Sequence, residues 1–474
     1  MSAPPASVSE LIDELREAVD PEAVSTDPAH LDECSADAYW KAIAARAAGE
    51  PLGRPDVVVS PSSEQEIAAI VRIANDRRMP VVPRGGGSGT QGGAVPIAGG
   101  IVLDLGRLNR ILAVDEESLT VTAEAGVNGK RLENELNERG LMLPHYPASA
   151  EWATVGGYVA ARGSGVLSTR YGKIEDLVLS LGVVTPTGEP IETLPVPRHA
   201  AGPELTQLFI GSEGTLGVVT RATLQLARVP AHRRFEAVTF PAIEPGFAAV
   251  REALALGLRP SVVRLYDELA TRTTLGPVVE RELDGVCTLL CFEGESPVAD
   301  AEAEVFLGLA RLAGAEVLEP GLGELWWERR YDFYHPPHHP ELPAVWGTVE
   351  ATATYARLLD VYRAVRAAVE PYERSAGLKL KTHFSHWYPW GAMMYGRFVI
   401  PDGGPDAVEL HDALWDDAVD AILAAGGVMN DHHGVGLKLG HHMQAQWGAA
   451  FESLRRIKAA LDPNGIMNPG KLGL

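Results

Sequence analysis

The sequence predicts an α+β protein built from two main domains, and three observations carry this prediction. A strand–helix–strand pattern begins near Pro55 and runs directly into a glycine-rich loop, which is typical of a small α/β domain. The residue pattern changes around Pro230. From there to about Gly426, helical and strand patterns alternate and aromatic residues become more frequent. A chain of 474 residues usually divides into about two or three domains, which fits this division.

The composition argues against several classes of protein. Lys and Arg number 41 against 63 Asp and Glu, and the resulting charge of −22 argues against a protein that follows nucleic-acid phosphates or docks on anionic lipid. Three cysteines are too few for a disulfide framework. The N-terminal residues lack the basic and apolar regions of a signal peptide, and no apolar run is long enough to cross a membrane. We therefore expect a cytoplasmic protein without a nucleic-acid partner or a membrane span, although a local basic pocket still allows an anionic substrate.

The chain up to residue 230 is predicted to contain a covering segment and the first domain. Residues 1–50 form the covering segment, with an amphipathic helix at 7–20 and a loop of small and polar residues from 31 to 55. Residues 51–230 form the first domain, whose first helix starts with a capping box between Ser63 and Glu66. Strands are expected at 57–59, 80–83, 101–105 and 119–126, and a second helix at 130–139. Residues 177–189 are expected to form a strand, a turn and a strand, and residues 209–226 a glycine-rich turn followed by a strand.

The second half of the chain is predicted to form a substrate domain and a returning tail. Residues 231–425 form the substrate (cap) domain, in which the apolar periodicity places helices near 243–257, 298–313, 353–370 and 405–425. Residues 426–474 form a C-terminal segment with one apolar helix stripe and a turn-rich end.

The glycine-rich loop PRGGGSGTQGG (83–93) indicates an anion-binding backbone. Glycines let the main chain approach a ligand closely and turn its N–H groups inward, and a pyrophosphate is the obvious ligand. Gly87, Gly89 and Gly92 match G-x-G-x-x-G, but AVPIAGG and then a strand follow, so no helix opens there as a nicotinamide-type Rossmann fold requires. Two more glycine-rich segments, 149–165 and 211–219, suggest a long ligand held by backbone, and a dinucleotide fits this demand.

These segments resemble the vanillyl-alcohol-oxidase-type (PCMH-type) flavoproteins. The resemblance rests on PRGGGSGTQGG, PASAEWATVGGYVAARGSGVLSTRYGKIEDLV, GSEGTLGVVTRATL and LDPNGIMNPGKL, and it covers nearly the whole chain beyond about residue 50. It implies a two-lobed FAD-binding domain, a cap domain with an antiparallel sheet and helices, and a C-terminal segment that returns to the FAD. Because the first loop contains no His or Cys, we expect the FAD to be held non-covalently, while His145 leaves a covalent link open.

The resemblance also implies the residues that contact FAD. They lie in the three glycine-rich segments and in the C-terminal tail: Arg84, Gly85, Gly86, Gly87, Ser88, Gly89, Thr90, Pro147, Ser149, Thr154, Gly156, Gly157, Ala160, Gly163, Ser164, Gly165, Glu213, Gly214, Gly217, Val218, Val219, Asn468 and Lys471.

Two branches of this superfamily are similar to different parts of the chain. The D-lactate, glycolate and D-2-hydroxyglutarate dehydrogenases are similar in two motifs, NPGK (468–471) and LWWERR (325–330). Alkyl-dihydroxyacetone-phosphate synthase is similar in three others, SVVRLYD (261–267), HFSHWYPWGAMMYGRF (383–398) and DHHGVG (431–436). Both patterns are incomplete here.

The metal-using dehydrogenases place two His around a GDGN turn and a Glu–His pair before GIG. In this chain His386 matches the first His, but Tyr395 stands at the second and His432 replaces the Glu, so no metal is expected. The ether-lipid synthase carries three consecutive His before GVG, and Asp431 replaces the first of them here.

The candidate catalytic residues follow from what alcohol oxidation by a flavin needs. A base must take the hydroxyl proton, and His432 or His433 suits this role, with Tyr395 and His386 as further candidates. A cation must hold an anionic tail, and Arg264 interrupts an apolar strand where it faces either solvent or a pocket.

Further features of the sequence leave alternatives open. Each candidate has a structural alternative, such as a solvated strand face for Arg264 or a satisfied core hydroxyl for Tyr395. Arg329 and Arg397 are second-choice clamps for the anion, and HPPHHP (335–340) indicates a rigid exposed loop that could serve as a lid.

The function that these residues favour is an FAD-dependent oxidoreductase that oxidises a small, anionic hydroxylated substrate by hydride transfer to flavin. The alternatives are a flavin-dependent transferase that resembles the ether-lipid synthase, and a non-catalytic FAD-binding subunit of a dehydrogenase complex. The expected partners are a small-molecule substrate, an electron acceptor that is oxygen, a quinone or a protein, and further copies of the chain in a homo-oligomer.

Overall fold

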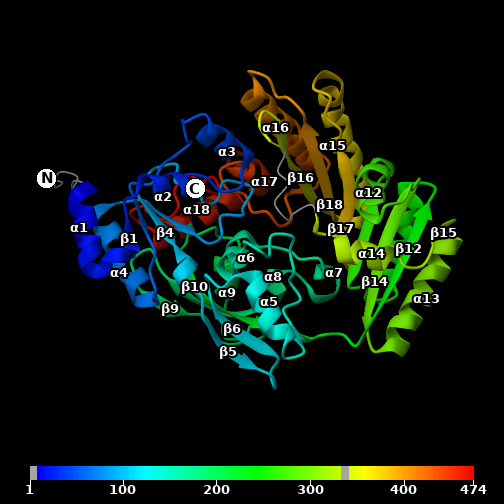
Figure 1. Cartoon of the computed structure of the whole chain (residues 1–474), viewed down its shortest axis with the longest axis horizontal. Helices are drawn as coiled ribbons and strands as arrows, with labels where there is room; N and C mark the ends of the chain where they lie inside the picture. The colour runs from blue at the N-terminus through cyan, green and yellow to red at the C-terminus, as the bar shows by residue number, and fades with distance from the viewer. Residues whose placement is uncertain (1–7, 333–340) are drawn as a thin grey trace.

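The fold was analysed in a computed structural model, which describes residues 8–332 and 341–474. The predicted α+β class is confirmed, because helices and largely antiparallel sheets are mixed along the chain. Figure 1 shows two masses: the N-terminal lobes at the left and below, and a sheet with its helices at the right. None of the helices that the structure describes is long and apolar enough to cross a membrane.

The first lobe is a four-stranded sheet whose strands end at the glycine-rich loop. The order is β1 (Val24–Ser25), β2 (Val57–Val59), β4 (Ile101–Asp104) and β3 (Val81–Arg84), with the last three parallel. The helix α4 (Glu64–Arg77) starts at the predicted cap, where the Ser63 hydroxyl accepts the N–H of Glu66. It packs with α1 (Val8–Ala18) in an apolar core that also includes these strands.

The prediction of a loop over residues 31–55 is wrong, because the segment contains helix. The short helix α2 (Pro28–Glu33) begins after Asp27, whose carboxylate accepts the N–H of Ala29, and α3 (Trp40–Ala47) follows. Trp40 is buried and donates its indole N–H to the carbonyl of Ala344 at 2.8 Å. A large aromatic residue anchored in the second domain therefore orders a stretch whose composition alone indicates a loop.

The second lobe is an antiparallel sheet that carries the other two glycine-rich segments. Its order is β5 (Ile111–Asp115), β6 (Thr120–Glu124), β10 (Val218–Gln225), β8 (Val178–Val184) and β9 (Pro190–Glu192), and α5 (Gly129–Asn137) and α6 (Val155–Ala161) pack on it.

The second glycine-rich segment is not loop throughout, since α6 lies within it. The Thr154 hydroxyl caps this helix by accepting the N–H of Gly157. A Cβ at Gly156 would lie 2.8 Å from that of Ala125, so glycine is what lets the helix approach β6 so closely.

The cap domain is built on an eight-stranded antiparallel sheet. In spatial order its strands are β15 (Glu316–Val317), β12 (His232–Phe240), β14 (Val286–Gly294), β13 (Val262–Tyr266), β17 (Lys381–Tyr388), β18 (Gly391–Ile400), β16 (Val345–Thr354) and β19 (Val428–Met429). Four helices close to the predicted positions share one core with this sheet: α10 (Ile243–Ala255), α13 (Ser296–Leu312), α15 (Tyr355–Ser375) and α16 (Ala407–Ala424). A second cluster joins strands β12 to β14 to the helix α14 (Leu322–Arg329).

The C-terminal segment leaves the cap sheet and returns to the first lobe. After β19 it forms a 3₁₀ turn (Gly440–His442), α17 (Met443–Trp447) and α18 (Ala450–Leu461). Residues 466–468 then lie beside β3, where the N–H of Val81 donates to Ile466 and the N–H of Asn468 donates to the carbonyl of Val81, both at 2.8 Å. Figure 1 shows this red segment against the blue first lobe.

Candidate active site

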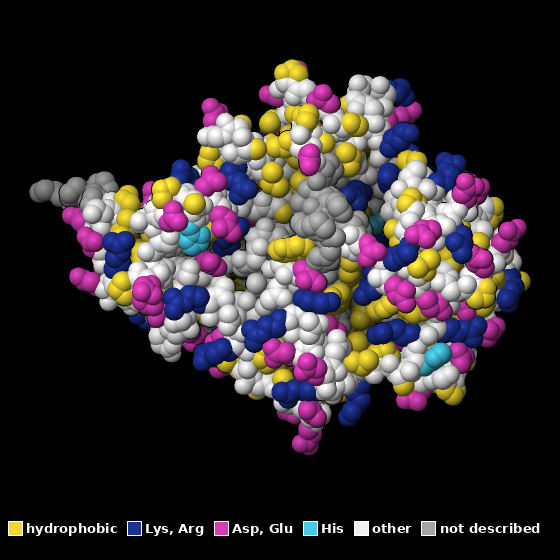
Figure 2. Space-filling model, viewed as in Figure 1, with side chains coloured by type: hydrophobic (Ala, Val, Ile, Leu, Met, Phe, Trp, Pro, Cys, Tyr) yellow, Lys and Arg dark blue, Asp and Glu magenta, His cyan; other side chains and the backbone are white. Residues whose placement is uncertain are grey.

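A cavity of about 590 Å³ lies between the glycine-rich segments and the cap sheet. Its lining includes all three predicted glycine-rich segments on one side and residues of β13, β17, β18 and the loop after β19 on the other. Figure 2 shows acidic and basic side chains interspersed over one outer face, so the overall negative charge does not form a single patch there. Segments far apart in the sequence therefore meet around one space.

The first glycine-rich loop presents free main-chain donors to this cavity. Within the described chain, the N–H groups of Gly87, Ser88, Gly89 and Thr90 donate no hydrogen bond to a protein acceptor. A Cβ at Gly86 would lie 1.7 Å from the carbonyl oxygen of Trp152, so a larger residue does not fit at this position. Unpaired N–H groups in a tight turn form a concave site for an anion.

Glu213 ties the third glycine-rich segment to the loop that carries the histidines. Its carboxylate accepts the N–H of Val435 and, at 2.8 Å, the N–H of Gly436. Burial raises the pKa of Glu213 to about 7 although these two N–H groups oppose the rise. Glu213 also has a φ of +49°, a backbone conformation that few side chains adopt and that is often found at functional sites.

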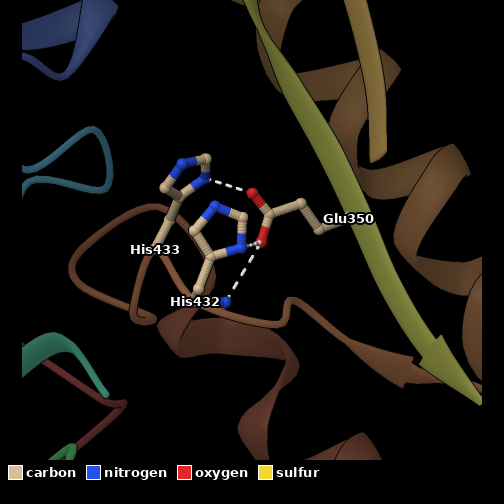
Figure 3. Close-up of side chains that lie close together, drawn as sticks. All are labelled: Glu350, His432 and His433. Atoms are coloured by element: carbon tan, nitrogen blue, oxygen red, sulfur yellow. Dashed lines mark hydrogen bonds and ion pairs between the residues drawn. The ribbon is translucent and has the colours of Figure 1, made fainter. Parts of the chain in front are cut away.

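Glu350, His432 and His433 form a buried charged cluster at the cap side of the cavity. Figure 3 shows both imidazole rings directed at the carboxylate, which projects from β16. His433 Nδ1 contacts Oε1, and His432 Nδ1 lies 3.2 Å from Oε2 as a charge contact rather than an aligned hydrogen bond. The main-chain N–H groups of Asp431 and His432 also donate to Oε2, at 3.0 and 3.2 Å.

The two histidines of this cluster have opposite pKa shifts. Burial alone would lower the pKa of His432, but the carboxylates of Glu350 and Asp431 outweigh it and raise this pKa to about 9. Burial lowers the pKa of His433, and Glu350 only partly offsets that effect. At neutral pH the arrangement therefore pairs a charged imidazole with a neutral one.

Asp431 organises the other side of the histidine loop. Its side chain accepts hydrogen bonds from the hydroxyls of Ser164, Thr352 and Tyr388, each at 3.0 Å, and its Oδ2 lies 2.9 Å from His386 Nδ1. The nearby Lys173 and His386 hold the pKa of Asp431 well below its usual value despite burial. Asp431 is thus a fixed anion that orients its neighbours.

The register of the cap sheet places one row of polar and aromatic side chains beside this cluster. Glu350 on β16 pairs with Tyr395 on β18, Tyr395 with His383 on β17, and His383 with Tyr266 on β13. Residues opposite one another in neighbouring strands share a face, and the last three side chains line the cavity.

Arg264 lies on the same face as this row, two residues before Tyr266 on β13. Its Nη1 lies 3.2 Å from Nε2 of His383, and its guanidinium is 5.5 Å from the ring centre of Trp326. Burial, and then the charge of Arg264, hold the pKa of His383 well below its usual value, so this ring is neutral and accepts the Arg264 N–H. In the described residues Arg264 forms no ion pair with a carboxylate, which leaves its charge to the cavity.

Comparison with known proteins gives the family. Residues 55–194 match the family described as FAD binding domain, and residues 229–472 match the family described as FAD linked oxidases, C-terminal domain. The chain belongs to the FAD-linked oxidase family. The protein is therefore an enzyme that uses FAD, and the predicted cofactor is confirmed.

Several relatives align with most of this chain. An alkyldihydroxyacetonephosphate synthase from Trypanosoma brucei brucei is 30% identical over 88% of this chain and 73% of its own length. YgcU of Escherichia coli (strain K12), an uncharacterized FAD-linked oxidoreductase, is 31% identical over 98% of both chains. A mitochondrial D-lactate dehydrogenase [cytochrome] from Arabidopsis thaliana is 31% identical over 88% of this chain and 73% of its own.

Solved structures support the predicted PCMH-type fold. An alkyldihydroxyacetonephosphate synthase has a TM-score of 0.82 at 26% identity, over 100% of this chain and 87% of that one. p-Cresol methylhydroxylase with bound substrate has a TM-score of 0.78 over 98% of this chain and 96% of its own, and at 18% identity it shows the fold alone.

The residues of the cavity fit FAD. The free N–H groups of Gly87 to Thr90 suit a pyrophosphate, and the cavity extends from them to the histidine cluster. Most of the predicted FAD residues line this cavity, but Val218, Asn468 and Lys471 do not. The side chain of Val218 lies in the apolar core, since strand alternation turns it away from the cavity side taken by Gly217 and Val219.

Asn468 and Lys471 contact the glycine-rich segments on the side away from the cavity. The Asn468 amide donates to the carbonyls of Gly93 and Glu213 at 2.9 and 2.6 Å, and the buried Lys471 ammonium donates to the carbonyl of Val95 at 2.8 Å. They therefore hold two glycine-rich segments in place rather than facing the cavity.

The structure corrects one predicted anion clamp of the cap domain and adds two site residues that the sequence analysis did not name. The prediction that Arg329 serves as an anion clamp is wrong, because its side chain points outward from α14 and forms an ion pair with Glu280 at 2.7 Å. Arg330 and Arg397 line the cavity instead. The expected exposed loop at 335–340 lies outside the described residues. Glu350 and His383 were missed. The signal for Glu350 is a lone carboxylate in the apolar strand pattern WGTVEATAT.

Proposed function

We propose that this FAD-linked oxidoreductase oxidises a small anionic alcohol, such as a 2-hydroxyacid, by hydride transfer to FAD. The observation that carries the proposal is the placement of a neutral His433, a charged His432 and the guanidinium of Arg264 around one cavity that also includes the glycine-rich segments. Bound FAD supplies the two-electron acceptor, while the chain supplies binding and proton transfer.

Each cap-side residue has a distinct role in this proposal. His433 takes the proton of the substrate hydroxyl, and Glu350 stabilises the imidazolium that results. The charged His432 stabilises negative charge on the substrate oxygen as the C–H bond breaks. Tyr395 lies between the histidines and His383, with its ring centre 6.0 Å from that of His432, and orients the same oxygen.

Arg264 binds the anionic group of the substrate. The cavity wall also includes Arg330, Lys381 and Arg397, which suits a carboxylate or a phosphate in a protein whose total charge is −22. Burial lowers the pKa of Lys381, with Arg397 contributing, and an anion bound there would reverse that effect. The proposal uses no metal at this centre.

A second candidate is an exchange in which an alkyl group from an alcohol replaces the acyl group of an acylated ketone phosphate and the acyl chain leaves as a carboxylate, as in the ether-lipid synthase. It is favoured by the 30% identity to alkyldihydroxyacetonephosphate synthase and by the His432–His433–Gly434 sequence in the loop after β19. It shares the anion clamp with the oxidation but needs no net transfer of electrons to the flavin.

Anaerobic mixing of the yellow holoenzyme with a substrate panel separates these functions. An oxidoreductase bleaches the flavin absorbance with a 2-hydroxyacid or a polyol, and His433→Ala should slow bleaching by roughly 10²-fold or more without loss of FAD. The control His232→Ala changes a half-exposed histidine paired with Asp300, outside the cavity, and should bleach at the wild-type rate. A response only to acyl-dihydroxyacetone phosphate, with alkyl product, would establish the second candidate instead, and no response to any compound would support a non-catalytic subunit.

The electron acceptor is tested in a second mixing step. The reduced enzyme is exposed separately to oxygen, a soluble quinone and cytochrome c, and the return of flavin absorbance is timed. The fastest of the three identifies the class of acceptor.

A further inference from the structure

A cluster of two histidines and two aspartates lies outside the active-site cavity. Asp416 and Asp420 are one turn apart on α16 of the cap domain, while His441 and His442 belong to the 3₁₀ turn of the C-terminal segment. Asp416 Oδ1 lies 2.7 Å from Nε2 of His441 and 3.0 Å from Nε2 of His442. Both rings thus direct the same type of nitrogen at one carboxylate oxygen.

We propose that Asp416, His441 and His442 bind one divalent transition-metal ion, most suitably Zn²⁺. One ligand atom from each of the three residues falls in a group that spans no more than 4.8 Å. Tetrahedral zinc with ligands at about 2.0–2.1 Å needs ligand atoms about 3.3 Å apart. The Asp416 oxygen, at 2.7 and 3.0 Å from the two histidine nitrogens, therefore needs to move away from them by about 0.6 and 0.3 Å. Two imidazoles and a carboxylate are a ligand set that favours zinc over magnesium or calcium.

Asp420 completes the chemistry of this site. Its Oδ1 lies 3.7 Å from Nδ1 of His442, the ring nitrogen opposite to the one that faces Asp416. A carboxylate that faces this nitrogen favours the tautomer with its proton on Nδ1, which leaves the Nε2 lone pair for the metal, as at many protein zinc sites.

The position of the cluster leaves room for solvent to complete the coordination. The side chain of His441 is 58% exposed and that of Asp416 48%, whereas His442 is 8% exposed. Metal ions therefore reach the site from solvent, and water fills the fourth position.

Metal at this site would join two parts of the cavity wall. The helix α16 carries His411, which lines the cavity, and Trp415, whose ring centre lies 3.4 Å from the Lys438 ammonium of the C-terminal segment. A bond between α16 and the turn at 440–442 would fix these neighbours in place. The site is independent of the proposed oxidation, since none of its ligands touches the histidine cluster that includes Glu350.

The test is a titration of chelator-treated, FAD-loaded enzyme with ZnCl₂ by calorimetry and with CoCl₂ by visible absorbance. Wild-type enzyme should bind one equivalent of metal that both Asp416→Asn and His441→Ala lose, and Zn²⁺ should raise the melting temperature only where this equivalent binds. Asp420→Asn should weaken the affinity by about 10–100-fold, as expected for a carboxylate that supports a ligating histidine.

Asp417→Asn is the matched control. Asp417 lies on the same helix but accepts the hydroxyl of Tyr372 at 2.6 Å, so its loss should leave metal binding unchanged. Flavin absorbance verifies that each variant is folded. Metal binding that survives both Asp416→Asn and His441→Ala would place the ion at the Glu350 cluster instead, and that result, or no binding at all, would overturn the proposal.

Discussion

Glu350 and His432 form a buried ion pair that joins the cap sheet to the loop after β19, with Oε2 3.2 Å from Nδ1. The pair decides the charge of the histidine, because Glu350 is the main group that raises the pKa of His432 against the effect of burial. Four predictions follow from this pair, from the anion clamp and from the tail.

Replacing the carboxylate should move the pH dependence of turnover. In Glu350→Gln the pKa of His432 falls from about 9, since the largest charge that opposes burial is lost and only Asp431 remains, and the alkaline limb of kcat moves to lower pH. At pH 8 we expect kcat to decrease roughly 10²-fold. Glu341→Gln, an exposed neighbour of β16, is the control. A pH profile that keeps its alkaline limb in Glu350→Gln would remove the assigned role of the pair.

The same pair should make stability depend on pH in a defined direction. The pKa of His432 is about 9 in the folded chain and near 6.5 when unfolded, so the folded state binds the extra proton between these values. The stabilisation is fully present below pH 6.5 and is lost as the pH rises through about 9. Thermal unfolding should show a melting temperature that declines over this window more steeply in the wild type than in Glu350→Gln, and equal slopes would argue against the raised pKa.

Removing the anion clamp should weaken substrate binding without releasing FAD. Arg264→Ala deletes a charge-assisted contact, so kcat/KM should fall by about 10–100-fold, with Arg264→Lys in between. Steady-state kinetics and the flavin-to-protein absorbance ratio measure the two effects. Arg329→Ala breaks only the outward pair with Glu280 and should resemble the wild type. Loss of FAD from Arg264→Ala would show that the residue is structural.

The amide of Asn468 should matter for FAD affinity although its side chain does not line the cavity. Asn468→Asp keeps the shape but replaces the donor that holds the carbonyls of Gly93 and Glu213 by an acceptor, so FAD should bind about tenfold more weakly or worse. Asn464→Asp, in the same tail but exposed and bonded to Asn75, should bind FAD normally. Fluorescence of released flavin gives both dissociation constants.

The sequence predicts the local features of this enzyme better than its long-range ones. The cap helices and the strand after the first glycine-rich loop could be predicted, since apolar periodicity and glycine spacing are local properties. His432, His433 and Arg264 could be found because each stands in a short motif or interrupts an apolar run.

Glu350 could not be linked to His432 from sequence, since their contact depends on the pairing of β16 with β18 and β19, which is fixed only by the assembled sheet. Arg329 and Arg330 also show that sequence alone does not tell which residue of a helix faces a cavity. They are adjacent in sequence, and the packing of α14 decides which of them faces the cavity.

The pairing of residues 466–468 with β3 has a consequence for how the protein is made. The strand that leads into the first glycine-rich loop gains its last partner only after the whole cap domain has been synthesised. In a nascent chain that still lacks residues 466–468, the strand before the first glycine-rich loop has no partner on this side, so the FAD site is incomplete. We therefore expect FAD to be loaded only after residues 466–468 have been synthesised.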